Sequence, residues 1–276
     1  YAYLAVDNEG FEIYDISNPG IDPTYVSNVV TDPLFSILVS GQYLYAGTED
    51  SGGELKIFDI SDQTATVFVG EVDADATINE MVIRGNYLYA VSNGSGDDLE
   101  IFDISDPANP IKVGEVSVSS LNLYGLSLNG NTAYVQGFDL TAGVIDITDP
   151  TNPVLIQSIT DGGEDADDSI VVGDYLYIAT QTATDGDEIE VFDISSSTNP
   201  IKVGSGDVDA DANQLVAQGG YLYTVSAGTG DDFTIHKLPT LTTPTAQIGN
   251  LLAGDIETSY LTVTQALKAD SLNINT

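Results

Sequence analysis

The sequence predicts an all-β protein, a β-propeller of four-stranded antiparallel blades, from three observations. Short runs of alternating apolar and polar residues are separated by Gly, Asn, Asp and Pro, as in half-buried strands joined by turns. This pattern repeats with a period of about 44 residues. Each period holds four such runs, and a repeat of this length with four strands is typical of the blades of a propeller.

The clearest copy of the repeat spans residues 86–130. Its four runs are Tyr87-Leu-Tyr-Ala-Val, Leu99-Glu-Ile-Phe-Asp-Ile, Ile111-Lys-Val-Gly-Glu-Val and Leu126-Ser-Leu-Asn-Gly. Counted from the centre of the ring outward, strand a is the run that ends in Gly, and strand b carries Tyr-Leu-Tyr. Strand c carries Leu-x-Ile-Phe-Asp-Ile, and strand d follows the Pro. One such sheet cannot bury both of its faces, so successive copies are expected to pack face to face.

Six copies are visible before residue 250. Strand b begins at residues 1, 43, 87, 132, 175 and 221. The first copy lacks a strand a before Tyr1, and the sixth ends in Thr245-Ala-Gln-Ile as a candidate strand d. We therefore expect residues upstream of Tyr1 to close the ring, which has six blades if they supply one strand and seven if they supply another repeat. The absence of Trp disfavours a WD-type propeller.

Composition narrows the classes of function. Six Lys and Arg against 43 Asp and Glu give a formal net charge of −37 at pH 7, so nucleic acid is not expected as a partner. No apolar run approaches the roughly 20 residues that span a bilayer, so no membrane insertion is expected in this segment. The chain has no Cys, and its single His236 lies in a strand-like run. Because no nucleophile motif is present either, an enzyme is not expected.

The acidic residues collect in the predicted loops. In a four-stranded meander the b–c and d–a connections emerge on one side of the ring, and these loops hold most of the loop acids, including the run 161–168. One face is therefore expected to be strongly negative. Carboxylates spaced by two can turn toward one hard cation, which makes calcium the candidate cofactor and a plain solvated surface the alternative. The candidate metal ligands are Asp73, Asp75, Asp207, Asp209 and Asp211.

The Asp at the end of strand c recurs in five copies, at Asp15, Asp59, Asp103, Asp146 and Asp193. An Asp in this place can accept hydrogen bonds from nearby backbone amides and hold the c–d turn. We therefore interpret it as structural. The tyrosines of strand b likewise fit a half-buried sheet and require no ligand.

The repeat at residues 87–114 resembles the LVIVD repeat, a propeller repeat of many bacterial and archaeal surface and secreted proteins. The similarity extends over about nine-tenths of the chain. It implies an extracellular or cell-surface module for binding or display. It supplies no shared catalytic motif, because propellers host many unrelated activities.

The pattern changes after a first domain at residues 1–249. Residues Leu252, Val263 and Ile274 are 11 apart, and the runs Leu261-Thr-Val-Thr and Leu272-Asn-Ile-Asn favour strands over a helix. Residues 250–276 resemble the start of the repetitive β-stalks that precede chaperone domains in phage tail fibres. Such a thin apolar stripe has no core of its own, so we expect self-association there as a homotrimer.

These observations favour an extracellular display or adhesion module that binds a glycan or protein ligand through an acidic propeller face without catalysis. A polysaccharide-acting hydrolase or lyase, with acids at the ring mouth, is one alternative. A structural subunit of a surface filament or sheath is the other.

Overall fold

The computed structural model describes one compact unit within Tyr1–Leu238. The described residues are 1–6, 10–49, 52–93, 98–118, 122–160, 165–181, 187–208, 211–227 and 233–238. In these ranges the secondary structure consists of β-strands, and no helix there is long and apolar enough to cross a bilayer. The predicted stalk at residues 250–276 lies outside the described residues, so its trimeric association stays a prediction.

The strands form six antiparallel sheets in chain order. Sheet 1 holds β1 (Ala2–Val6), β2 (Gly10–Asp15) and β3 (Thr24–Val29). Sheet 2 holds β4 (Leu34–Ser40), β5 (Tyr43–Thr48), β6 (Leu55–Asp59) and β7 (Val67–Val72). Sheet 3 holds β8 (Thr77–Arg84), β9 (Tyr87–Asn93), β10 (Asp98–Asp103) and β11 (Ile111–Ser117).

The second half of the unit repeats this plan. Sheet 4 holds β12 (Leu123–Asn129), β13 (Thr132–Gly137), β14 (Leu140–Asp146) and β15 (Val154–Ile159). Sheet 5 holds β16 (Asp165–Val172), β17 (Tyr175–Gln181), β18 (Ile189–Asp193) and β19 (Ile201–Gly206). Sheet 6 holds β20 (Asp211–Gln218), β21 (Tyr221–Ala227) and β22 (Phe233–Lys237).

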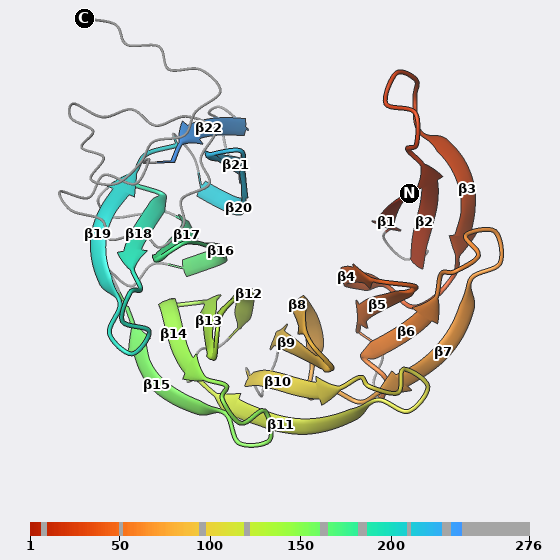
Figure 1. Ribbon diagram of the computed structural model, residues 1–276, viewed down its shortest axis with the longest axis horizontal. Coiled ribbons are helices and arrows are strands. Elements are labelled where there is room, and N and C mark those ends of the chain that lie inside the picture. The colour runs from red at the N-terminus through yellow and green to blue at the C-terminus, as the bar shows by residue number, and fades with distance from the viewer. Residues whose placement is uncertain are drawn as a thin grey trace, which may run out of the picture. The chain divides into compact units, whose positions relative to one another are not determined.

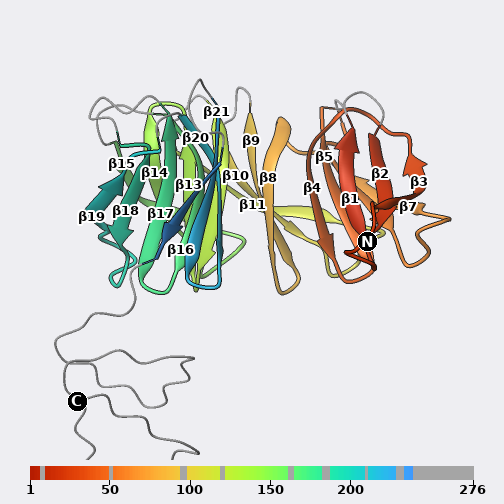
Figure 2. The same ribbon diagram turned by 90° about the horizontal axis from the view of Figure 1, so that it is seen from above.

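The predicted all-β propeller and its strand order are confirmed. Within each sheet the order a, b, c, d of the sequence is the order of hydrogen-bonded neighbours. Sheet 1 begins at strand b, as expected, and the predicted strand d of sheet 6 falls in residues 245–248, outside the described ranges. Strands β4, β8, β12, β16 and β20 face the centre, while β7, β11, β15 and β19 lie at the outside (Figure 1). Seen from the side, the strands of neighbouring sheets run alongside one another (Figure 2).

The core lies between the sheets rather than inside any one of them. Leu88 and Phe102 on one face of sheet 3 pack with residues of sheet 2, and both side chains are fully buried. Ile101, on the opposite face, packs with residues of sheet 4, and Val113 of β11 borders the same cluster. These four residues confirm the predicted face-to-face packing of successive copies. Period-2 alternation places neighbouring residues on opposite faces, so each sheet contributes to two cores.

The recurrent Asp holds the c–d turn, as predicted. In five sheets its Oδ1 accepts a hydrogen bond of 2.8–2.9 Å from the backbone N–H two residues later, and the donors are Ser17, Ser61, Ser105, Thr148 and Ser195. Hydrogen bonds from the side chain and the backbone N–H of these Ser and Thr residues stabilise the ionised form and lower the pKa of each Asp. The Gly that ends strand a is equally regular, because in five sheets its φ lies between 54° and 64°, where a side chain would be strained.

A second recurrent glycine accommodates the turn of the next sheet. A Cβ at Gly114 of β11 would overlap the carbonyl oxygen of Pro150 and lie 3.1 Å from Pro153 Cδ, both in the c–d turn of sheet 4. Gly204 has the same place in sheet 5, but among the described residues the nearest atom to its Cβ would be Val191 Cβ at 4.0 Å. The two positions are therefore a matched pair.

We expect Gly114→Ala to lower the free energy of unfolding by about 1–3 kcal/mol, because the added methyl must displace the Pro150 backbone. Gly204→Ala should change it by less than about 0.5 kcal/mol, or raise it slightly, since the methyl meets no described atom closer than 4.0 Å and the unfolded chain loses entropy. Urea unfolding of the two variants measures the difference. Equal effects of the two substitutions would show that the c–d turn of sheet 4 does not require a glycine at residue 114.

Candidate functional site

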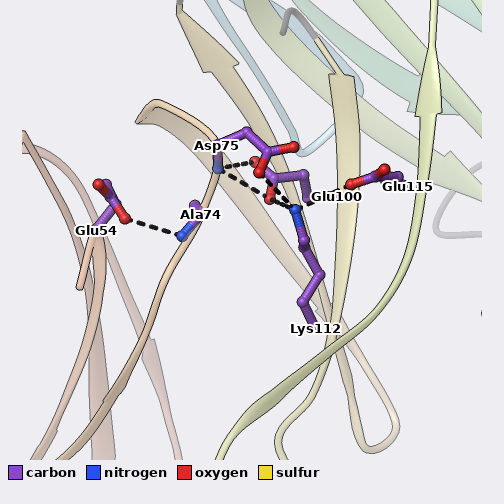
Figure 3. Close-up of polar contacts among 6 residues, drawn as sticks. All are labelled: Glu54, Ala74, Asp75, Glu100, Lys112 and Glu115. Atoms are coloured by element: carbon purple, nitrogen blue, oxygen red, sulfur yellow. Dashed lines mark hydrogen bonds and ion pairs between the residues drawn. The ribbon is translucent and has the colours of Figure 1, made fainter. Parts of the chain in front are cut away.

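The structure groups carboxylates in two places. One contains predicted metal ligands, and the other was not predicted from the sequence. The first is the segment between β7 and β8, which carries the predicted metal ligands Asp73 and Asp75. Lys112 of β11 reaches this segment, and its Nζ lies 2.7 Å from Asp75 Oδ1 (Figure 3). The backbone N–H of Asp75 donates to the carboxylate of Glu100 at 3.2 Å, and that of Ala74 donates to Glu54 at 2.9 Å. The cation beside Asp75 in this structure is therefore an ammonium group.

Lys112 is the centre of this network. Its Nζ is also 3.1 Å from Glu100 Oε2 and 2.9 Å from Glu115 Oε2. Partial burial disfavours its charge, but the bonds to Asp75 and Glu115 and the charge of Glu100 outweigh burial and raise the pKa of Lys112. Burial raises the pKa of the fully buried Glu100 to about 7, against the opposing pull of Lys112.

Similar pairs join strands c and d of other sheets. In sheet 5, Lys202 Nζ lies 2.9 Å from Glu190 Oε1. In sheet 2 the strand c residue is basic, and Lys56 Nζ lies 3.8 Å from Glu71 of strand d and 2.7 Å from Asp32, which precedes β4. Half of the six Lys and Arg residues of the chain therefore serve ion pairs within this repeated framework.

The remaining predicted metal ligands are less informative. Asp73 is exposed, Asp207 follows β19 and is exposed, and Asp211 is the first residue of β20. Asp209 lies outside the described residues. Among the residues that are described, no three His, Cys, Asp or Glu side chains are grouped so that they could hold a metal ion. The calcium site therefore stays a prediction.

That prediction has a direct test. Calcium should raise the unfolding temperature more than magnesium at the same ionic strength, because a loop of alternating carboxylates suits the larger and less geometrically strict ion. Asp209→Asn should remove part of the difference. Differential scanning calorimetry with sodium as the ionic-strength control measures it. Equal effects of calcium, magnesium and sodium would leave only a solvated acidic surface.

The second place is a pocket of about 400 Å³ lined by the inner strands of five sheets, here called the inner-strand pocket. Each of these strands has a β-bulge at the same repeat position. A bulge adds one residue that the ladder skips and re-aims the side chains beside it. The skipped residues are Phe35, Asn79, Tyr124, Asp167 and Asn213, and all five line the pocket.

The residues that follow the skipped ones bridge neighbouring sheets. Glu80 of β8 accepts a 2.6 Å hydrogen bond from the backbone N–H of Leu126 in sheet 4. Asp168 of β16 accepts one of 2.8 Å from the backbone N–H of Leu215 in sheet 6. Gly125 has the equivalent place in β12, and a Cβ there would lie only 2.8 Å from the carbonyl oxygen of Asp167. The absence of a side chain at Gly125 and the hydrogen bonds of Glu80 and Asp168 together set the spacing of the inner strands.

The two carboxyl groups have unusual proton affinities. Desolvation raises the pKa of Glu80 to about 8, and the negative charge of Asp168 adds to the effect. Desolvation likewise raises the pKa of Asp168 to about 6, although the N–H groups of Leu215 and Ser169 oppose the shift. At neutral pH the pair therefore holds about one proton, mainly on Glu80.

Part of this site does not lie where the sequence predicts it. The run 161–168 is expected in a d–a loop, but Asp165, Asp167 and Asp168 belong to β16, and Asp168 is partly buried. The usable signal was the pair of residues just before the apolar run of strand a. It reads Asn79-Glu80, Asp167-Asp168 and Asn213-Gln214, polar at one repeat position in three copies. The sequence signal for the pocket is therefore a pair of polar residues that recurs on the inner strand, not the acidic residues of the loops.

Comparison with known proteins supports the fold. The model of the beta propeller domain family matches residues 36–265, and that of the LVIVD repeat matches residues 1–31. None of the curated proteins compared with the chain matches it. The resemblance to the LVIVD repeat is thereby confirmed for residues 1–31, and the propeller fold for residues 36–265.

Solved structures with similar folds have diverse roles. A putative 6-phosphogluconolactonase from Bacteroides fragilis NCTC 9343 has a TM-score of 0.71 at 12% identity, over 85% of this chain and 75% of its own. A chain of the mitotic checkpoint complex has a TM-score of 0.67 at 14% identity, over 84% and 69%. The computationally designed Ika8 protein has a TM-score of 0.61 at 11% identity, over 82% of this chain and 64% of its own, so this chain spans less than two thirds of its length. Such identities show the fold alone.

Proposed function

The chain belongs to the beta propeller domain family, matched over residues 36–265, and from that premise we propose that it is a non-catalytic binding module that takes its ligand in the inner-strand pocket. The pocket itself carries the proposal. Its volume of about 400 Å³ falls within the range of small-ligand sites, and polar side chains from several sheets converge on it. It is lined by no Ser–His or Lys nucleophile within the described residues.

We further propose that the module works outside the cell or at its surface, in display or adhesion. The LVIVD repeat at residues 1–31 and the charge of −37 support this placement, since many surface proteins share the repeat and an acidic chain stays dispersed. Trimerisation through residues 250–276 would present several pockets together and raise avidity.

The experiment titrates isotopically labelled protein with neutral oligosaccharides, oligolysine and sulfated oligosaccharides and follows backbone amide signals by NMR. We expect at least one class to shift the signals of β8, β16 and β20. Asn213→Leu, which fills the pocket, should abolish the shifts, whereas Asn131→Leu, in an exposed turn, should not. If no class shifts the inner strands, or if Asn213→Leu binds as wild type does, the pocket is not a binding site.

One observation favours a second candidate, a hydrolase or lyase acting on polysaccharide. Glu80 and Asp168 are coupled carboxyl groups of different proton affinity in one pocket, the arrangement that general acid catalysis uses. If this function holds, the protein should release reducing ends or unsaturated products from a polysaccharide, and Glu80→Gln should abolish the release while binding persists. Binding without turnover in the wild type would exclude it for that polysaccharide.

A further inference from the structure

We propose that the inner-strand pocket recognises a neutral saccharide, held by an aromatic ring at the mouth and by side-chain amides within. This inference rests on the proposed binding function and names the class of ligand. It stands on three features of the pocket: an exposed aromatic ring, amide groups with unused hydrogen-bonding capacity, and carboxylates that already accept hydrogen bonds from groups of the protein.

The aromatic feature is Phe35, the residue that the bulge of β4 leaves unpaired. It is 52% exposed, and it lines the pocket together with the polar residues of the other inner strands and a few apolar ones. An exposed aromatic ring beside polar groups suits a ligand with both an apolar face and polar edges, and the C–H face of a sugar ring is of this kind. Tyr124 adds a second ring, and its hydroxyl accepts a bond of 3.3 Å from Asn122, which leaves its proton free to donate.

The amide feature comes from two other sheets. Asn79 donates through Nδ2 to the carbonyl oxygen of Leu123 at 2.7 Å, and its Oδ1 accepts no bond from the described residues. Asn213 donates to Asp167 at 2.8 Å and likewise keeps Oδ1 available among them. Gln214 is exposed at the pocket, and its amide forms no hydrogen bond within the described part of the chain. Sugar hydroxyls donate and accept at once, which amides match on both counts.

The carboxylates argue against a cation as the principal ligand. Both oxygens of Asp168 accept backbone N–H bonds, from Ser169 at 2.7 Å and from Leu215 at 2.8 Å. Asp167 Oδ2 already accepts from Gln181 and Asn213. Donors of the protein therefore already stabilise the negative charge of these carboxylates, which weakens the case for a cation. The same negative charge repels an anionic ligand. A neutral ligand with many hydroxyl groups fits this balance.

The test is an array of neutral oligosaccharides built from glucose, galactose, mannose and N-acetylglucosamine, with oligolysine and a sulfated oligosaccharide as competing probes. We expect at least one neutral saccharide to bind, and Phe35→Ala to weaken that binding roughly tenfold or more, as expected when a central aromatic contact is removed. Phe68→Ala is the matched control, because Phe68 is also about half exposed, at 51%, but lies on the outer strand β7. It should bind as wild type does.

The other results overturn the inference in distinguishable ways. If oligolysine or the sulfated probe binds in the pocket and no neutral saccharide does, the ligand class is wrong but the binding function stands. If saccharides bind and Phe35→Ala has no greater effect than Phe68→Ala, the saccharide does not use this pocket. If no probe binds at all, the class of ligand and the proposed function fail together.

Discussion

Truncation of Phe102 to Ala is expected to lower the free energy of unfolding by about 3–5 kcal/mol. The side chain is fully buried and lies in the cluster that joins sheets 2 and 3. Its removal leaves a cavity between two sheets, and neither sheet can move to fill it without disturbing its other face. Chemical denaturation followed by circular dichroism measures the change.

Phe68→Ala provides the comparison for this prediction as well. Phe68 is 51% exposed, although its ring contacts Phe58 with centroids 5.7 Å apart. We expect it to cost less than half as much as Phe102→Ala, because the site can fill with water. Equal costs for the two variants would contradict the assignment of the core to the spaces between sheets.

The stability of the protein is expected to fall as pH rises from about 5 to 8, because Glu80 binds its proton more tightly when folded. Its pKa is raised from 4.5 to about 8, so between these values the folded state keeps a proton that the unfolded state has lost. Each unit of that window costs about 1.4 kcal/mol, which gives a loss on the order of 3–5 kcal/mol across it. Asp168, with a pKa raised to about 6, acts in the same direction below pH 6.

Glu80→Gln isolates this effect from the general repulsion of an acidic chain. The amide oxygen of Gln can still accept the bond from Leu126 but cannot titrate, so the variant should gain on wild type by a comparable amount between pH 5 and 8. Asp174→Asn removes one exposed charge in a turn and should leave the profile parallel to that of wild type. Thermal unfolding at several pH values measures these profiles. Parallel profiles for Glu80→Gln and wild type would show that folding does not raise the pKa of Glu80.

Much of the fold could be predicted because its signals are local and repeated. The Asp at the end of strand c bonds an amide two residues away, and the Gly that ends strand a needs only its own φ. Alternation along ten or fewer residues decides which face Leu88 and Ile101 occupy. Copies of one local pattern reinforce one another, so errors in any single copy matter little.

The inner-strand pocket could not be predicted in the same way. The acids of residues 165–168 look like loop residues, because a run of polar residues beside Gly carries no mark of strand pairing. A bulge is a two-against-one match with the neighbouring strand, so it becomes visible only when the ladder is known. Likewise, no sequence pattern near Asp75 predicts its ion pair with Lys112, 37 residues later.

The all-β class follows from the sequence alone, as do the order of strands in each sheet, the turns and the face of each core residue, because alternation and turn chemistry act over a few neighbouring residues. Which carboxylates meet which partners depends on how the sheets pack. Glu80 accepts a hydrogen bond from Leu126, 46 residues away, and Asp168 accepts one from Leu215, 47 residues away, so each partner lies about one repeat along the chain, in the next sheet. The packing of one sheet on the next sets those distances, and with them the proton affinities and the pocket.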